Sequence, residues 1–112
     1  MTMRALDAAV ALEKDNVDVA VLHVPTIKPL DTAKILEEAR KGGRLVVTAE
    51  NHTVVGGLGE AVAGLLLTNG VTPSFRMVGL PDEFLEAGAL PTLHEMYGLS
   101  VDKLTARIRS WL

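Results

Sequence analysis

A carboxylate and an imidazole lie two residues apart in the segment Glu50–Gly59, where the sequence concentrates residues suited to chemistry. Alternate side chains of an extended backbone point to the same side, so Glu50 and His52 are expected to point the same way. A histidine beside a carboxylate can take up and release a proton near neutral pH. No nucleophile or metal partner accompanies the pair, so we interpret it as a polar pair at a substrate-side or interface surface, and we assign no catalytic residue.

Three glycines, Gly56, Gly57 and Gly59, follow this pair and open a predicted helix. The start of a helix exposes unpaired N–H groups, and glycine lets an anion approach them closely. The spacing matches neither the G-x-G-x-x-G pattern of dinucleotide sites nor the Gly-Lys-Ser/Thr ending of phosphate loops. Two interpretations stay open: a tight turn that permits close packing of the helix on a sheet, or a helix start that binds an anion.

The remaining polar candidates are single residues. Lys28 lies on the predicted loop Thr26–Asp31, where it could contact an anion on the substrate side or at an interface. His23 falls inside a predicted buried strand, and His94 lies on a predicted short helix. A zinc site needs three or four converging ligands, and the chain has no cysteine and no H-x-x-x-H or H-E-x-x-H spacing. We therefore predict no metal site.

Composition limits the classes of protein to which the chain can belong. The 112 residues fit one domain, which we predict to span residues 1–112. Hydrophobic residues make up 48% of the chain and aromatic residues only 4%, so the core must consist of Ala, Val, Leu and Ile. The net charge of -3 and the scattered Lys and Arg residues argue against a nucleic-acid surface. Neither a signal peptide nor an apolar run of roughly 18 residues is visible, so we expect a cytoplasmic protein.

Hydrophobic periodicity predicts alternating strands and helices, with Thr2, Asp31 and Ser100 as helix caps. The predicted helices are Thr2–Lys14, Thr32–Lys41, a helix from Leu58 that ends at Asn69–Gly70, Pro91–Tyr97 and a last helix after Ser100. The predicted strands are Val17–Val24, Leu45–Ala49 and Ser74–Gly79. Such alternation is typical of a three-layer α/β/α fold with a small, mostly parallel sheet covered on both faces.

One feature of this order is unusual. The chain opens directly with a helix, whereas a doubly wound unit normally begins with a strand that leads into its first helix. Three strands against five helical segments also make a thin sheet.

Taken together, these segments resemble the last domain of the transketolase family. Thr26–Asp31 resembles the strand-exit segment of the family. Thr48–His52 followed by Val55–Val62 resembles its glutamate–histidine and glycine-rich signature. Gly79–Phe84, with Gly98–Ser100 and the final helix, resembles its tail. The resemblance covers almost the whole chain in the expected order, and it is greatest to transketolase that is split into two polypeptides.

The resemblance implies a C-terminal structural or assembly domain of an enzyme of the pentose phosphate pathway that transfers a two-carbon ketol unit between sugar phosphates. Such an enzyme uses thiamine diphosphate and Mg²⁺, held by the two preceding domains, one of which carries a Gly-Asp-Gly segment. This sequence contains no Gly-Asp-Gly. The domain is therefore expected to bind no cofactor and to be inactive alone. Its expected partners are cofactor-binding transketolase domains or a separate subunit, in a dimer or another homo-oligomer.

The resemblance leaves alternatives open. The same type of domain closes 1-deoxyxylulose-5-phosphate synthase and the β subunits of 2-oxo-acid dehydrogenases, so a domain of the synthase is one alternative. A stand-alone anion-binding or regulatory module that uses the Gly56–Gly59 helix start is another. Family members carry a strand just before the segment that matches Met1–Leu6. We therefore expect a sheet that lacks its first strand and exposes an edge open to strand addition.

Overall fold

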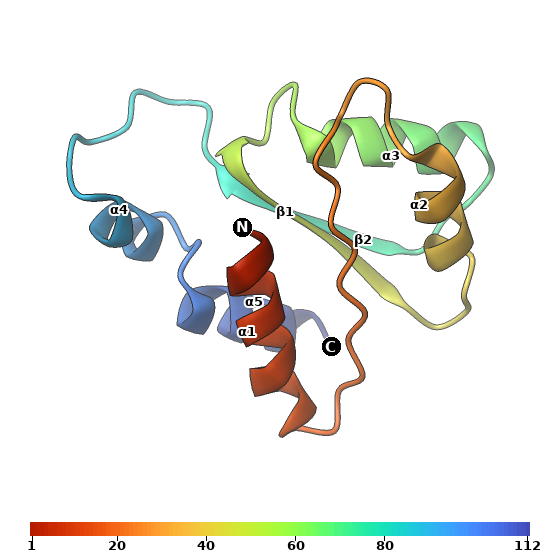
Figure 1. Cartoon of the computed structure of the whole chain (residues 1–112), viewed down its shortest axis with the longest axis horizontal. Coiled ribbons are helices and arrows are strands. Elements are labelled where there is room, and N and C mark those ends of the chain that lie inside the picture. Colours follow the sequence, from red (N-terminus) through yellow and green to blue (C-terminus); the bar gives the residue numbers. More distant parts are fainter.

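The computed structural model describes all residues, 1–112, and contains five helices and two strands. In chain order the elements are α1 (Thr2–Glu13), α2 (Thr32–Ala39), β1 (Leu45–Thr53), α3 (Leu58–Thr68), β2 (Ser74–Leu80), α4 (Leu90–Met96) and α5 (Val101–Trp111) (Figure 1). None of the helices combines the length and the apolar character needed to cross a membrane.

The sheet consists of β1 and β2, which run parallel and are joined through α3. Residues Leu45 to Ala49 pair in register with Ser74 to Val78, and the register shifts before Thr53 pairs with Leu80. Each strand therefore has one paired edge and one edge without a neighbour. The parallel pairing that the sequence predicts is confirmed.

Helices cover both faces of this sheet, which confirms the predicted three layers (Figure 1). One core cluster consists of Ile35 and Ala39 of α2 with Val62 and Leu66 of α3, packed on Val46 and Phe75. The other consists of Ala8 of α1, Val78 of β2, Leu99 just before α5, and Leu104 of α5. Apart from the partly buried Phe75 and Trp111 at their margins, both clusters are aliphatic, as the low aromatic content requires.

Two of the three predicted helix caps are confirmed. The side chain of Asp31 accepts a hydrogen bond from the Lys34 N–H at 3.1 Å, and Ser100 caps α5 in the same way. The prediction for Thr2 is wrong, because Thr2 is already the first helical residue of α1. Its hydroxyl instead lies 2.8 Å from Nδ1 of His23, which is exposed and not part of a buried strand.

The predicted strand Val17–Val24 does not form. No backbone–backbone hydrogen bond joins any of residues 18–29, although Val17, Val19 and Val21 are half-buried and the residues between them are exposed. The alternation is that of a strand with one covered face, but a strand also needs a neighbour within about 4.8 Å. Here β1 and β2 pair only with each other, so the segment remains an extended connection between α1 and α2 (Figure 1).

The N-terminal helix is held to the rest of the protein mainly by α5. Ala8 of α1 packs with Leu104 of α5, and the Arg109 guanidinium contacts the Asp15 carboxylate at 2.6 Å. The two ends of the chain, 94 residues apart at this ion pair, thus form one helical layer.

Candidate functional site

The carboxylate of Glu50, near the end of β1, occupies the start of α3. Its Oε2 accepts a hydrogen bond from the Leu58 N–H at 2.7 Å, and its Oε1 accepts one from the Gly59 N–H at 2.9 Å. These N–H groups belong to the first turn of α3, which has no side-chain cap of its own. Glu50 is only 7% exposed. An internal anion therefore takes the position that the sequence leaves open to an external one.

The glycines make this contact sterically feasible. A Cβ atom at Gly57 would collide with the carboxylate of Glu50, and one at Gly59 would collide with Met77. Gly56 has a φ of 72°, a conformation that favours glycine, and its N–H donates to the Glu60 carboxylate at 2.8 Å. Of the two interpretations of these glycines, the structure supports the tight turn with close packing.

Glu50 and His52 do not form a pair. His52 is exposed, and its Nδ1 donates to the carbonyl oxygen of Thr53 at 2.8 Å, whereas both oxygens of Glu50 are directed to α3. The expectation that the two side chains point the same way depends on regular alternation along β1. The register shift between Ala49 and Thr53 breaks that alternation, and Asn51 and His52 are consequently both exposed.

Lys28 lies apart from this arrangement. It is exposed on the connection between α1 and α2, its peptide bond to Pro29 is cis, and its side chain makes no hydrogen bond or ion pair. No interaction joins it to Glu50 or His52. The three polar residues that the sequence singles out are thus not brought together into one site.

The structure adds a connection that the sequence analysis missed. His94 of α4 is 3% exposed, and its Nε2 donates to Oδ1 of Asn51 at 3.1 Å, while its Nδ1 has no partner. Burial lowers the pKa of His94, and the positive charges of Arg4 and of the N-terminal amino group lower it further. A neutral His94 therefore ties the end of β1 to α4. The one feature of the sequence that could have pointed to this contact is the position of Asn51 between Glu50 and His52.

The polar groups at this end of the sheet hold α3 and α4 in position. The Glu50 carboxylate is committed to two backbone N–H groups, so it is not free to serve as a general base. No group of three or more His, Asp or Glu side chains is arranged to hold a metal ion. The Glu50–Asn51–His52 segment instead fixes α3 through Glu50 and α4 through Asn51.

The comparison with known families agrees with this arrangement. Residues 1–104 match the family described as "Transketolase, C-terminal domain". A solved split-gene transketolase, an inactive beta4 tetramer, superposes with a TM-score of 0.83 at 38% identity, and the match covers 97% of this chain and 34% of that one.

Two sequence relatives place the chain more closely. It is 66% identical to an uncharacterised transketolase family protein of Sinorhizobium fredii over 113 residues, covering 100% of this chain and 33% of the relative. It is 39% identical over 100 residues to a 1-deoxy-D-xylulose-5-phosphate synthase of Heliobacterium modesticaldum, covering 89% of this chain and 15% of the synthase. The chain thus spans about a third or less of the length of these relatives. The chain belongs to the transketolase family, of which it forms the C-terminal domain.

Proposed function

We propose that the chain is the structural or assembly domain of a transketolase-type enzyme that transfers a two-carbon ketol unit between sugar phosphates, and that it is not catalytic alone. The observation that carries the proposal is the use of Glu50. In a chain that matches the family over residues 1–104, the carboxylate of Glu50 caps the start of α3. His52 faces solvent without a catalytic partner.

The glycine-rich start of α3 does not fit the diphosphate of thiamine diphosphate. A diphosphate needs unpaired backbone N–H groups or clustered cations, and the glycine-rich start of α3 is filled by Glu50. We place the cofactor and its Mg²⁺ in other parts of the complete enzyme. Calorimetric titration of the purified chain with thiamine diphosphate and Mg²⁺ should give no more binding heat than titration with inorganic phosphate under the same conditions. A saturable heat that exceeds this phosphate control would contradict the proposal.

The assembly role is supported by two stretches of unpaired backbone. One edge of β1 has no neighbour, and residues 18–29 have no backbone hydrogen bond. An added strand would satisfy backbone groups that are now unpaired. We propose that the free edge of β1 promotes association with another copy of the chain or with a further polypeptide. Sedimentation velocity at several concentrations should show reversible self-association. A single monomer species at every concentration would contradict it.

The second candidate is the C-terminal domain of a 1-deoxyxylulose-5-phosphate synthase, which the 39% identity to the Heliobacterium enzyme favours. Co-expression of the chain with a cofactor-binding polypeptide of the transketolase family separates the two. Transfer of a ketol unit to an aldose phosphate supports the first candidate, and condensation of pyruvate with glyceraldehyde 3-phosphate supports the second. Cell fractionation of the same culture tests the expected cytoplasmic location.

A further inference from the structure

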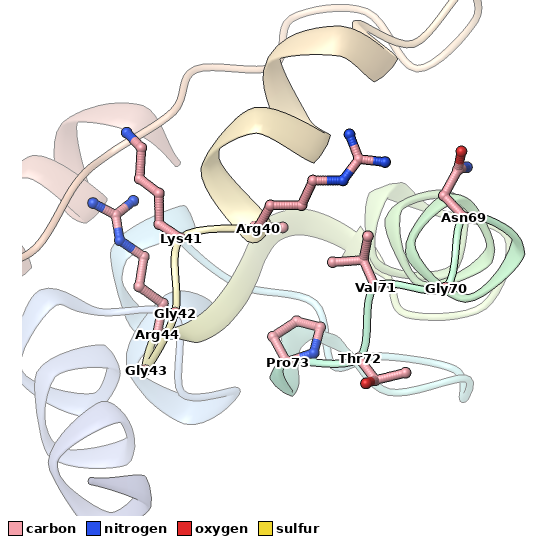
Figure 2. A pocket seen from close by; sticks show the side chains of 11 residues that line it. Arg40, Lys41, Gly42, Gly43, Arg44, Asn69, Gly70, Val71, Thr72 and Pro73 are labelled. Atoms are coloured by element: carbon pink, nitrogen blue, oxygen red, sulfur yellow. The ribbon is translucent and has the colours of Figure 1, made fainter.

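A hollow of about 360 Å³ lies at the amino ends of β1 and β2, the end of the sheet away from Glu50 (Figure 2). It is bounded by the end of α2 and the turn that follows it, residues 39–44, and by the connection from α3 to β2, residues 69–73. Only a few of its lining residues are apolar. The hollow therefore suits a small polar ligand better than an apolar one.

The lining of this hollow is cationic. Arg40, Lys41 and Arg44 contribute three positive charges and no carboxylate lines it, although the chain as a whole carries -3. Figure 2 shows the Arg40 side chain extending from the end of α2 toward Asn69. The backbone N–H of Arg40 donates to the Leu36 oxygen at 3.0 Å, but its side chain makes no hydrogen bond and no ion pair. Its guanidinium, with five donors in a planar fork, is therefore free for a ligand.

The other two cations are held in place from outside the hollow. Glu38 contacts Lys41 at 2.7 Å and Arg44 at 2.7 Å, and it also contacts Lys34 at 3.0 Å. Hydrogen bonds from Lys41, Lys34 and Arg44 lower the pKa of Glu38 to about 2, so it remains ionised at neutral pH. One carboxylate thus fixes three cations without neutralising them, and Arg40 adds a fourth charge nearby.

Backbone groups around the hollow favour an anion as well. The N–H groups of Gly42 and Gly43 donate no hydrogen bond. The carbonyl groups at the end of α3, which would repel an anion, are already paired. The Asn69 side chain donates to the Leu65 oxygen at 2.8 Å, and the Val71 N–H donates to the Leu66 oxygen at 2.9 Å.

We propose that this hollow binds the phosphate group of a small molecule, with Arg40 as the main contact and the Gly42–Gly43 N–H groups beside it, while Lys41 and Arg44, whose side chains extend to the other side of the turn, add positive charge from there (Figure 2). Arginine forks and clustered backbone N–H groups are the donors that phosphate prefers. The site is independent of the contact between Glu50 and α3 on which the proposed function rests, because it lies at the opposite end of the sheet and uses none of the same residues. The competing role for Arg40 and Lys41 is to stabilise the negative C-terminal end of α2.

Titration of the ¹⁵N-labelled chain with inorganic phosphate, at constant ionic strength against sodium chloride, distinguishes these roles. Phosphate should shift the amide signals of Gly42, Gly43 and Thr72 in a saturable way, and chloride should not. Arg40→Ala should weaken phosphate binding about tenfold, because one charge-assisted contact is lost. Arg76→Ala is the matched control: it removes an exposed arginine on β2, without an ion pair and outside the hollow, and should leave the dissociation constant unchanged.

Glycerol phosphate in a parallel titration identifies the source of the phosphate group. Tighter binding than inorganic phosphate indicates a phosphate ester, and equal binding indicates the free ion. Shifts that chloride reproduces, or equal losses in the Arg40→Ala and Arg76→Ala variants, would overturn the proposal in favour of general screening. If Arg40→Ala changes amide signals throughout the protein, Arg40→Gln, which keeps the side-chain length, replaces it.

Discussion

At the carboxyl end of β1 the carboxylate of Glu50 fills the start of α3, whereas at the amino end of the same strand Arg40, Lys41 and Arg44 surround a hollow without a carboxylate. The first arrangement satisfies its charge internally and closes a candidate anion site. The second leaves cationic charge open to solvent. The glycine-rich start of α3 resembles a binding site in the sequence, yet it serves to hold α3 against β1. The turn after α2, which the sequence does not mark, carries the accessible positive charge.

The largest expected effect comes from removing the internal anion. Glu50→Ala leaves the Leu58 and Gly59 N–H groups unpaired in a buried place, so it should lower the free energy of unfolding by about 3 kcal/mol. Glu60→Ala is the control, because Glu60 accepts one N–H in the same loop but is exposed, and it should cost less than about 1 kcal/mol. Urea denaturation measures both. Equal losses in the two variants would mean that the Glu50 contact is unimportant.

The next effect tests the close approach of the glycine to Glu50. Gly57→Ala forces a methyl group into the Glu50 carboxylate and should cost about 1–3 kcal/mol of unfolding free energy. Gly64→Ala, in the exposed middle of α3 with open space around it, should stabilise the protein by about 0.5–1 kcal/mol. Denaturation curves should therefore move in opposite directions. A Gly57→Ala protein as stable as the parent would remove the steric argument.

A smaller effect should appear as a pH dependence at the Glu50 end of the sheet. Because the pKa of folded His94 lies below its ordinary value of 6.5, the folded state favours neutral His94. This contribution to stability is complete above the unfolded pKa and is lost as pH falls through the folded pKa. Thermal unfolding between pH 8 and pH 5 should show the loss, and His94→Gln should reduce it. The exposed His52→Gln serves as the control and should retain the parent slope.

The smallest effect concerns the cationic end. Glu38→Gln removes the carboxylate that competes with a ligand for Lys41 and Arg44, so phosphate should bind a few-fold more tightly. Because these pairs are exposed, the stability of the fold should change little. The amide titration with phosphate measures the affinity. Weaker binding in this variant would show that holding Lys41 and Arg44 in place matters more than freeing their charge.

Local chemistry made most of the helices predictable. Asp31 and Ser100 begin α2 and α5 where their side chains can reach a backbone N–H three residues on, and the apolar repeat from Leu58 predicts α3. In each case the interaction that decides the structure lies within a few residues.

The remaining features depend on contacts between residues far apart in the chain, and these could not be predicted from the sequence. Val17–Val24 has the composition of a strand, but a strand forms only beside another, and composition does not supply the neighbour. Glu50 reaches α3 eight and nine residues away through a strand irregularity that no residue type marks. The cationic hollow needs the α3–β2 connection beside the turn after α2, and those segments are about 30 residues apart in the chain.

The extended connection of residues 18–29 should open more easily than the helices on either side of it. With no backbone hydrogen bonds, its amides should exchange with solvent almost as fast as in an unfolded chain. The helix before it is anchored through α5, and the helix after it is anchored through α3. Because the α1–α5 layer shares one buried core cluster with Val78 of β2, the connection should open locally while both helices stay in place.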